Sequence, residues 1–398
     1  MDITIQPGCL WGTVAAVPSK SQAHRLLICA ALADAPTELV CPATNRDIEA
    51  TVECLNALGA TITRHRSGYA VSPICSVPER AELNCRESGS TLRFLLPIAG
   101  ALGVDATFRM EGRLPQRPLS PLWEEMERMG CTLSRPAVDA VRCQGKLRSG
   151  EYVIDAGVSS QFVSGLLFAL ALLPQRSKLN LTGKMESRPY IDMTRRALAF
   201  FRVGTDDFRF SGGQRFHSPG ILPVEGDWSN GAFFMAANYL GSDINVTGLS
   251  PCSAQGDRAV AKILPLLVDY AQVDAADIPD LVPILAVVAG ARKGGEFTHV
   301  HRLRLKESDR VETICSMLRA LGGQAEADED TLTVFGTGYR GGTVDAAGDH
   351  RIAMAAAIAA TVCREPVTIL GAQCVGKSYP DFWEDYRRLG GCYEQQLR

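Results

Sequence analysis

Two kinds of apolar pattern alternate along the chain. In the first kind, apolar residues recur at helical spacing and are followed by a glycine and an alternating stretch, as in DIEATVECLNALGATITR. The segments of this kind begin at Asp47, Pro118, Tyr190, Gly256, Ser308 and Pro380. Each segment predicts an amphipathic helix followed by a strand, and their recurrence predicts an internally repeated fold.

The polar residues that flank these helices are also repeated. Five of the six copies keep the glycine, where a helix end favours the left-handed conformation: Gly59, Gly130, Gly204, Gly322 and Gly390. Five copies place an aspartate at the helix start, where its carboxylate can accept backbone N–H groups: Asp47, Asp192, Asp257, Asp309 and Asp381. The copy from Gly256 lacks the glycine, and Ser120 replaces the aspartate in the copy from Pro118.

The second kind of pattern is apolar on almost every side. Its six segments are SQAHRLLICAALA, STLRFLLPIAGALG, SSQFVSGLLFALALL, NGAFFMAANYLG, IPDLVPILAVVAGA and DHRIAMAAAIAATV. A helix of this kind must be surrounded by protein, so we expect these helices inside sheets formed by strands such as YVIDA and DINVTGL. Six α/β units of about 66 residues, three per lobe, account for 398 residues. The boundary between the lobes is expected near Glu225–Ser229, with a small-molecule site in the cleft between the lobes. A single doubly wound sheet is the alternative fold.

Composition and charge exclude several classes of protein. The 41 Lys plus Arg and 44 Asp plus Glu leave a net charge of −3, so there is no general positive field for nucleic acid or an anionic membrane. The longest uncharged run, Ala156–Gln175, is too polar for a membrane-spanning helix. The N-terminus lacks the features of a signal peptide, so a cytoplasmic protein is expected.

Neither the cysteines nor the histidines predict a structural cross-link or a metal site. The 13 cysteines form no CxxC pair and are expected to be reduced and mostly buried. His299 and His301 have the spacing of one face of a strand, and a strand surface is favoured over zinc because no Cys/His cluster lies nearby.

Basic, hydroxyl and glycine residues gather where the predicted helices begin. They are Lys20, Ser21, Arg25, Gly89, Ser90, Arg93, Arg113, Arg117, Ser159, Ser160, Gln161, Ser187, Tyr190, Arg304, Lys306, Arg310, Arg351 and Lys377. Helix starts with such residues bind phosphate or carboxylate without a metal. Because the chain is acidic overall, the pattern indicates a local site for a substrate with several anionic groups. Asp280 and Glu307 interrupt this field and are the candidates for acid and base chemistry.

One motif favours a different function. Gly371–Ser378 reads GAQCVGKS and satisfies the phosphate-loop pattern of nucleoside triphosphatases. Its context argues against that function, because Pro380 follows closely and no apolar strand with a magnesium-binding aspartate is present.

Ten ordered blocks between Val17 and Tyr386 resemble the 5-enolpyruvylshikimate-3-phosphate (EPSP) synthase family. They are VPSKSQAHRLL, ESGSTLRFL, LPQRPLSPL, SSQFVSGLL, ESRPYIDMT, VEGDWSNGAFF, IPDLVPILA, LRLKESDRVE, GDHRIAMAAA and VGKSYPDFWEDY. The resemblance implies the enolpyruvyl transferase fold, a two-domain inside-out α/β barrel of six βαβαββ units. It also implies an N-terminal lobe of residues 19–225 and a C-terminal lobe of residues 1–18 plus 226–398.

The resemblance also implies a reaction. Members of the family transfer the enolpyruvyl group of phosphoenolpyruvate to the 5-hydroxyl of shikimate 3-phosphate and release phosphate, with no metal or organic cofactor. The residues that match the shikimate 3-phosphate site are Lys20, Ser21, Arg25, Ser159, Ser160, Gln161, Ser187, Tyr190, Asp280 and Lys306. Those that match the phosphoenolpyruvate site are Lys20, Gly89, Arg117, Gln161, Arg310, Arg351 and Lys377. Asp280 would be the base at the hydroxyl and Glu307 with Lys20 would act at the methylene, although the group that delivers that proton stays open.

Departures from the common pattern leave some properties open. Glu87 stands where asparagine is usual and Arg302 where another asparagine is frequent, so neither residue is given a role. Gly89 is kept, which leads us to expect inhibition by glyphosate. A monomer is the family expectation. The alternatives are a transferase acting on UDP-N-acetylglucosamine, which is disfavoured because GRLPQRP lacks a cysteine, and a noncatalytic protein that binds phosphorylated metabolites.

Overall fold

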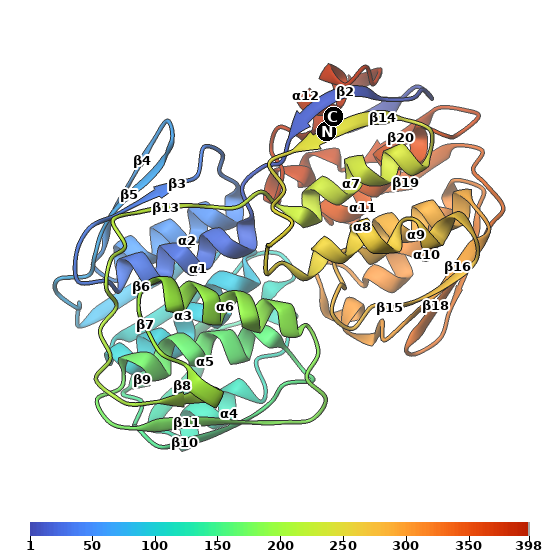
Figure 1. Ribbon diagram of the computed structural model, residues 1–398. Coiled ribbons are helices and arrows are strands. Elements are labelled where there is room, and N and C mark those ends of the chain that lie inside the picture. The colour runs from blue at the N-terminus through green and yellow to red at the C-terminus, as the bar shows by residue number, and fades with distance from the viewer. Residues whose placement is uncertain (397–398) are drawn as a thin grey trace. The chain divides into compact units, whose positions relative to one another are not determined.

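Two compact units form the computed structural model of the chain, which describes residues 1–396 (Figure 1). The first, hereafter the N-unit, is Pro18–Val224. The second, hereafter the C-unit, combines Met1–Val17 with Glu225–Arg398. The last two positions of the predicted C-terminal lobe, 397 and 398, lie outside the described residues.

The N-unit contains three α/β repeats. The first is α1 (Lys20–Ala31), β3 (Thr37–Val40), α2 (Arg46–Ala57), β4 (Thr61–His65) and β5 (Gly68–Ser72). The second is β6 (Arg80–Asn84), α3 (Gly89–Leu102), β7 (Asp105–Arg109), η1 (Leu114–Gln116), α4 (Leu122–Arg128), β8 (Cys131–Ala137) and β9 (Ala140–Gly145). The third is β10 (Glu151–Asp155), α5 (Ser160–Leu172), β11 (Ser177–Thr182), α6 (Arg188–Phe200), η2 (Asp206–Phe208) and β12 (Arg209–Phe210), and β13 (Ile221–Pro223) follows it.

The C-unit begins with β1 (Asp2–Ile5) and β2 (Trp11–Ala15) and continues with three further repeats. The fourth repeat is α7 (Trp228–Tyr239), β14 (Asp243–Thr247), η3 (Gly256–Ala259), α8 (Val260–Ile263) and η4 (Leu266–Val268). The fifth is β15 (Ala271–Asp274), α9 (Val282–Ala291), β16 (Gly294–Thr298), η5 (His301–Leu305), α10 (Arg310–Ala320), β17 (Gln324–Ala327) and β18 (Thr331–Phe335). The sixth is β19 (Gly342–Asp345), α11 (His350–Ala360), β20 (Val367–Leu370), η6 (Ala372–Lys377), α12 (Phe382–Arg388) and β21 (Tyr393–Gln396).

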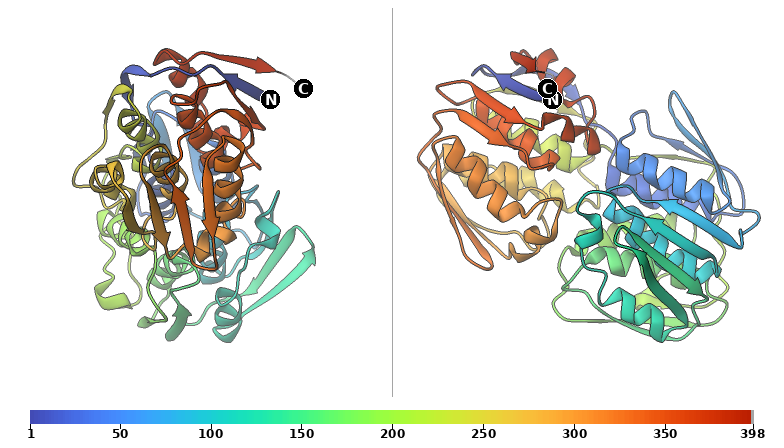
Figure 2. Two further views of the ribbon diagram at one scale, coloured as in Figure 1. Left: turned by 90° about the vertical axis from the view of Figure 1, so that its right-hand side faces the viewer. Right: turned by 180° about the vertical axis from the view of Figure 1, so that it is seen from behind.

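The sheets show how one βαβαββ plan is completed in different ways. In the second and fifth repeats, consecutive strands give the orders β6-β7-β9-β8 and β15-β16-β18-β17, with the first pair parallel and the others antiparallel. The first sheet, β13-β3-β5-β4, takes β13 from the far end of the N-unit, and the sixth, β19-β20-β1-β21, takes β1 from the chain start. The third has three strands, β10-β11-β12, and the fourth has two, β14-β2. Figure 2 shows the first strand, in blue, beside the last strand, in red, where β1 pairs with β21 at the end of the sixth sheet.

The expected division into inner and outer helices is confirmed. All 11 residues of α11 and 9 of the 10 residues of α9 are buried, whereas only 5 of 13 are buried in the amphipathic α6. Within each unit the inner helices pack on one another, α3 on α5 and α9 on α11. A Cβ at Gly165 of α5 would lie 2.2 Å from the carbonyl oxygen of Arg93, so only glycine lets α5 approach α3 this closely.

Several local expectations are corrected. Gly59, Gly130, Gly322 and Gly390 have positive φ, but Gly204 does not, and Arg202 has a φ of 60° just before it. Among the five aspartates expected to cap helices, only Asp309 makes the cap bond, accepting from the backbone N–H of Glu312 at 3.1 Å. The fourth amphipathic helix shortens to α8 between two 3-10 turns because Pro265 falls inside the segment and the terminal glycine is absent.

The histidine and cysteine expectations have different outcomes. Eight of the 13 cysteines are buried, as expected of mostly buried thiols. The strand assigned to His299 and His301 is wrong, because β16 ends at Thr298 and His301 begins η5. Nδ1 of each ring instead forms a hydrogen bond with a carboxylate, His299 with Asp274 at 2.9 Å and His301 with Asp330 at 2.8 Å. Within residues 1–396 no helix is long and apolar enough to cross a membrane.

Candidate active site

In the N-unit, Lys20 is the first residue of α1 and forms an ion pair. Its Nζ lies 2.9 Å from Oδ2 of Asp47, and both side chains are largely buried, at 14% and 10% exposed. Ser19 caps the helix by accepting from the backbone N–H of Gln22. Asp47 was expected to cap α2, but Asn45 holds that position and leaves the Asp47 carboxylate to Lys20. The pair fixes the lysine ammonium at the start of the helix.

Arg25 joins α1 to α6 from a buried position. Its Nε donates to Oγ1 of Thr194 at 2.8 Å, while Nη1 donates to the carbonyl oxygen of Ser21 at 2.5 Å and Nη2 to that of Tyr190 at 3.0 Å. Burial lowers the pKa of Arg25 to about 10. The hydrogen bonds of Arg25 set the positions of Ser21 and Tyr190, two of the residues predicted to bind substrate. Ser187, another of these residues, precedes α6 and has left-handed φ and ψ of 52° and 37°.

The starts of α3 and α5 are tied together by side chains. Nε2 of Gln161 donates to Oγ of Ser90 at 3.0 Å, and Oε1 of Gln161 accepts from Nη1 of Arg93 at 3.1 Å. Ser159 caps α5 by accepting from the backbone N–H of Gln161 at 3.2 Å, and Ser160 is the buried first residue of that helix. Two helix N-termini and their polar side chains thus converge within the N-unit, an arrangement that suits anions.

Gly89 opens α3 against two guanidinium groups. A Cβ at Gly89 would lie 2.6 Å from Nη1 of Arg93 and 2.7 Å from Nη1 of Arg117. The buried Nε of Arg117 has no hydrogen-bond partner within residues 1–396. Arg93 was among the predicted basic helix-start residues but was assigned to no substrate, and its contact with Gln161 makes it a supporting residue of this helix start. Glu87, which stands where asparagine is usual, lies against Gly112. A Cβ at Gly112 would be 2.2 Å from Oε1 of Glu87.

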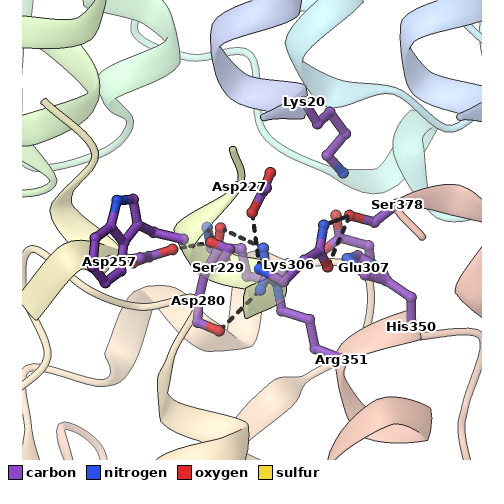
Figure 3. A network of polar contacts seen from close by, with 12 residues as sticks. Lys20, Asp227, Ser229, Asp257, Asp280, Lys306, Glu307, His350, Arg351 and Ser378 are labelled. Atoms are coloured by element: carbon purple, nitrogen blue, oxygen red, sulfur yellow. Dashed lines mark hydrogen bonds and ion pairs between the residues drawn. The ribbon is translucent and has the colours of Figure 1, made fainter. Parts of the chain in front are cut away.

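Asp280 is the centre of the charged cluster in the C-unit (Figure 3). It precedes α9, and Leu281 rather than Asp280 occupies the N-cap position of that helix, without a side-chain cap bond. Its carboxylate lies 2.7 Å from Nη1 of Arg310, 3.2 Å from Nη2 of Arg351 and 3.4 Å from Nζ of Lys306. Burial acts to raise the pKa of Asp280, but these three cations together hold it well below its usual range.

Arg310 begins α10 and is buried among three carboxylates. Its Nε lies 2.7 Å from Oδ2 of Asp349, Nη1 contacts Asp280, and Nη2 lies 2.6 Å from Oε2 of Glu307. Burial acts to lower the pKa of Arg310, but the carboxylates raise it well above its usual value. Glu307, the second candidate for proton transfer, is therefore held by an arginine.

The remaining cations of the C-unit have different surroundings. Burial lowers the pKa of Lys306, against the opposing attraction of Asp280, and the nearby charge of Arg302 in η5 contributes to the lowering. Lys377 is the buried last residue of η6. The motif GAQCVGKS thus forms a 3-10 turn, and α12 begins only at Phe382, which differs from the helix that follows the lysine of a phosphate loop.

Two buried acids near the cluster were not predicted as site residues. Asp349 caps α11 by accepting from the backbone N–H of Arg351 at 3.0 Å, and it also forms an ion pair with Arg310. Its only sequence signal was the position of an acid before an apolar helix, in GDHR. Asp257 was expected to be a helix cap, but it lies within η3 and accepts a hydrogen bond from Oγ of Ser229. No spacing rule predicts that contact, because 28 residues separate the partners.

The predicted residues therefore fall into two groups. The N-unit contains Lys20, Ser21, Arg25, Gly89, Arg117, Ser159, Ser160, Gln161, Ser187 and Tyr190, and the C-unit contains Asp280, Lys306, Glu307, Arg310, Arg351 and Lys377. Within the C-unit, four of the predicted residues converge directly on one carboxylate or its arginine partner.

Comparison with known proteins shows the family of the chain. The family model of EPSP synthase (3-phosphoshikimate 1-carboxyvinyltransferase) matches residues 5–386. The chain belongs to the EPSP synthase family. Relatives named 3-phosphoshikimate 1-carboxyvinyltransferase include one from Clostridium kluyveri, 38% identical over 98% of this chain and 97% of the relative. Another, from Clostridium beijerinckii, is 37% identical over 99% of this chain and 98% of the relative.

Solved structures support the fold. The EPSP synthase of Acinetobacter baumannii superposes with a TM-score of 0.81 at 22% identity, covering 99% of this chain and all of the other. The enolpyruvyl transferase NikO from Streptomyces tendae gives a TM-score of 0.76 at 19% identity, covering 100% and 99%. The predicted enolpyruvyl transferase fold is confirmed. So is the prediction of a transferase of the EPSP synthase reaction, which uses phosphoenolpyruvate and shikimate 3-phosphate in aromatic biosynthesis.

Proposed function

We propose that Asp280 is the base of the EPSP synthase reaction in this chain. The observation that carries the proposal is the convergence of Lys306, Arg310 and Arg351 on the buried carboxylate of Asp280. These cations keep the carboxylate ionised, which a proton acceptor requires, but they also make it a weak base. An anionic substrate that engages the same cations would reduce their pull and raise the pKa of Asp280. The base would thus gain strength when the substrate binds.

The substrate contacts follow from the chemistry of the two ligands. Phosphoenolpyruvate brings a phosphate and a carboxylate, which we assign to Lys20, Gly89, Arg117, Gln161, Arg310, Arg351 and Lys377. Shikimate 3-phosphate brings a phosphate and ring hydroxyls, which we assign to Lys20, Ser21, Arg25, Ser159, Ser160, Gln161, Ser187, Tyr190, Asp280 and Lys306. Arg25 already donates to three oxygen atoms of the chain, so in this proposal it orients neighbouring groups as well as supplying charge.

The proton balance requires two sites. The 5-hydroxyl of shikimate 3-phosphate loses a proton as its oxygen attacks carbon 2 of phosphoenolpyruvate, and carbon 3 gains a proton. The resulting tetrahedral intermediate then loses a proton from carbon 3 and expels phosphate, which restores the enolpyruvyl double bond. We assign the hydroxyl proton to Asp280 and the methylene to Glu307 with Lys20. At rest, Oε2 of Glu307 is held by Nη2 of Arg310 at 2.6 Å.

Three further properties belong to the proposal. Glyphosate should inhibit the enzyme, because Gly89 leaves room beside Arg117 for a phosphonate. We also propose a monomer that works in the cytoplasm. Size-exclusion chromatography with light scattering tests the oligomeric state. Inhibition that is seen only when glyphosate is far more concentrated than phosphoenolpyruvate would contradict the inhibitor assignment.

The central experiment measures phosphate release from phosphoenolpyruvate with and without shikimate 3-phosphate. We expect release by the wild type to need both substrates and to fall at least about 1000-fold in Asp280→Ala and Asp280→Asn. Asp269→Asn is the matched control, because Asp269 is 73% exposed and pairs only with the exposed Lys293 among the contacts of the described residues. Thermal unfolding shows whether each variant is folded.

The same assay separates the alternatives. Phosphate release that depends on UDP-N-acetylglucosamine would indicate the sister transferase. Binding of both ligands without release would indicate a noncatalytic protein. Undiminished turnover in folded Asp280→Asn would contradict the role of Asp280 while leaving the reaction itself intact.

A further inference from the structure

Asp257 is a buried acid that the proposed chemistry does not use. It lies in η3, is 3% exposed, and accepts through Oδ2 from Oγ of Ser229, the second residue of α7. Its other oxygen, Oδ1, is buried and has no hydrogen-bond partner within residues 1–396. Figure 3 shows the Asp257 carboxyl group directed at Ser229, within the network that contains Asp280. An ionised carboxylate with one unsolvated, unpartnered oxygen is costly, so this geometry favours the neutral acid.

The backbone on both sides of this contact is fixed by Gln255. Its Oε1 accepts from the backbone N–H of Trp228 at 3.1 Å, and its Nε2 donates to the carbonyl oxygen of Gly226 at 2.8 Å. Asp227, between those two residues, caps α7 by accepting from the backbone N–H of Asn230 at 2.9 Å. Ser229 and Asp257 are therefore held in register by neighbours whose own contacts do not depend on the acid. The pair is a built feature of the unit.

Charged groups from three elements act on Asp257. Asp280 precedes α9, Asp227 caps α7 and Arg351 lies in α11, while Ser229 supplies the hydrogen bond. Burial, followed by the negative charge of Asp280, raises the pKa of Asp257 to about 7, against the opposing effects of Arg351 and Ser229. Two nearby carboxyl groups cannot both ionise cheaply, and the three cations on Asp280 make it the one that stays charged.

We propose that Asp257 is a positioning residue that works as the neutral acid, donating its own proton to Oγ of Ser229 and leaving Asp280 as the charged member of the pair. Because Oγ of Ser229 then accepts a hydrogen bond from Asp257, the Ser229 hydroxyl can donate its own proton to another oxygen atom of the site. Loss of the proton from Asp257 reverses this hydrogen bond and places a second negative charge near Asp280. No proton leaves Asp257 during turnover. The inference rests on the proposed role of Asp280.

The test is the pH dependence of kcat in the full chain, with both substrates saturating, from pH 5.5 to 9. We expect wild-type kcat to fall about tenfold as pH rises through the range around 7, because the Ser229 hydroxyl then donates to the ionised Asp257 and its hydrogen bond to the site is lost. Asp257→Asn should keep near-maximal kcat and lose this alkaline decline, since the amide is neutral and its N–H can donate to Ser229. The substrate phosphates titrate in the same range, so the criterion is the difference between the variants. Asp269→Asn is the control and should retain the wild-type profile.

Two further measurements keep the inference falsifiable. Ser229→Ala should lower kcat at pH 6, where Asp257 is neutral, and an unchanged kcat there would overturn the proposal. The urea midpoint of Asp257→Asn minus that of the wild type should increase as pH rises from 5.5 to 8. This difference does not depend on the role of Asp280 in catalysis. A constant difference would show that Asp257 is already ionised at pH 5.5 and would refute the neutral acid. If Asp280→Asn stays active while this stability difference appears, the role of Asp280 fails and the protonation of Asp257 stands.

Discussion

Replacing Gly89 by alanine should separate substrate binding from stability. The added Cβ would lie 2.6 Å from Nη1 of Arg93 and 2.7 Å from Nη1 of Arg117, closer than real side chains approach. Both contacted atoms are the ends of long side chains, so the guanidinium groups move and the helix stays. Alanine is also favoured over glycine in a helix by about 1 kcal/mol. We therefore expect Gly89→Ala to be at least as stable as the wild type.

The cost appears in the binding of phosphoenolpyruvate. A displaced Arg117 loses one charge-assisted hydrogen bond to the ligand, which is worth about 1.5–3 kcal/mol. This corresponds to a rise of about 10- to 150-fold in KM for phosphoenolpyruvate. The KM for shikimate 3-phosphate should change much less, because Arg117 is assigned to phosphoenolpyruvate alone and Arg93 acts through its hydrogen bond to Gln161.

Steady-state kinetics and thermal unfolding of two variants test this reasoning. Gly100→Ala is the matched control on the same helix, since its Cβ would lie 2.8 Å from Sγ of the buried Cys131 and 3.1 Å from Leu147. It should lose about 1–3 kcal/mol of stability through overpacking and keep the wild-type KM values. An unchanged KM for phosphoenolpyruvate in Gly89→Ala, or a loss of stability like that of Gly100→Ala, would refute the argument.

Two other predictions concern buried charge. His24 is buried and hydrogen-bonded to Thr51 at 2.7 Å, and burial lowers its pKa to about 3, so stability is complete above pH 6.5 and is lost as pH falls toward 3. Urea unfolding should show the wild type losing about 2 kcal/mol more than His24→Gln between pH 7.5 and pH 5, and equal losses would contradict a neutral His24. Arg310→Leu should cost about 3–5 kcal/mol, because it leaves the fully buried Asp349 without its ion-pair partner. The half-exposed pair of Arg304 with Asp309 predicts less than about 1 kcal/mol for Arg304→Leu, and similar losses in both variants would show that burial is not the cause.

The repeat pattern was sufficient to predict most of the fold. The all-apolar segments became the buried helices, because a helix such as α9 has no polar face to expose. The pattern did not predict that the first and sixth sheets each take a strand from a distant part of the chain. The insertion of β13 beside β3 and of β1 between β20 and β21 joins segments far apart in sequence, and short strands such as Ile221–Pro223 carry no alternation that identifies a partner. The shortened fourth repeat was signalled by its missing glycine.

The candidate site was predicted as a set of residue types, and less well as a set of contacts. Helix-start motifs identified Asp280, Lys306 and Arg310, which the fold brings together. Two other buried carboxylates were assigned the wrong contacts. Asp47 and Asp257 were both interpreted as helix caps, since an aspartate before a helix is usually a cap. In the structure one pairs with Lys20 and the other with Ser229, and such pairings depend on packing between distant segments.

Two of the three arginines assigned to phosphoenolpyruvate start from different electrostatic states. Arg117 has a buried Nε without an acceptor within residues 1–396, so an anion reaching it displaces no carboxylate from that atom. Arg310 already contacts Asp280, Glu307 and Asp349, so an incoming anion must compete with acids of the chain. Competition weakens binding at Arg310, but it also frees the acids that lose their partner. Asp280 would lose part of the attraction that now opposes the effect of its burial, and its pKa would rise. In the proposed mechanism, the ion exchange that binds the substrate is therefore also the event that strengthens the base.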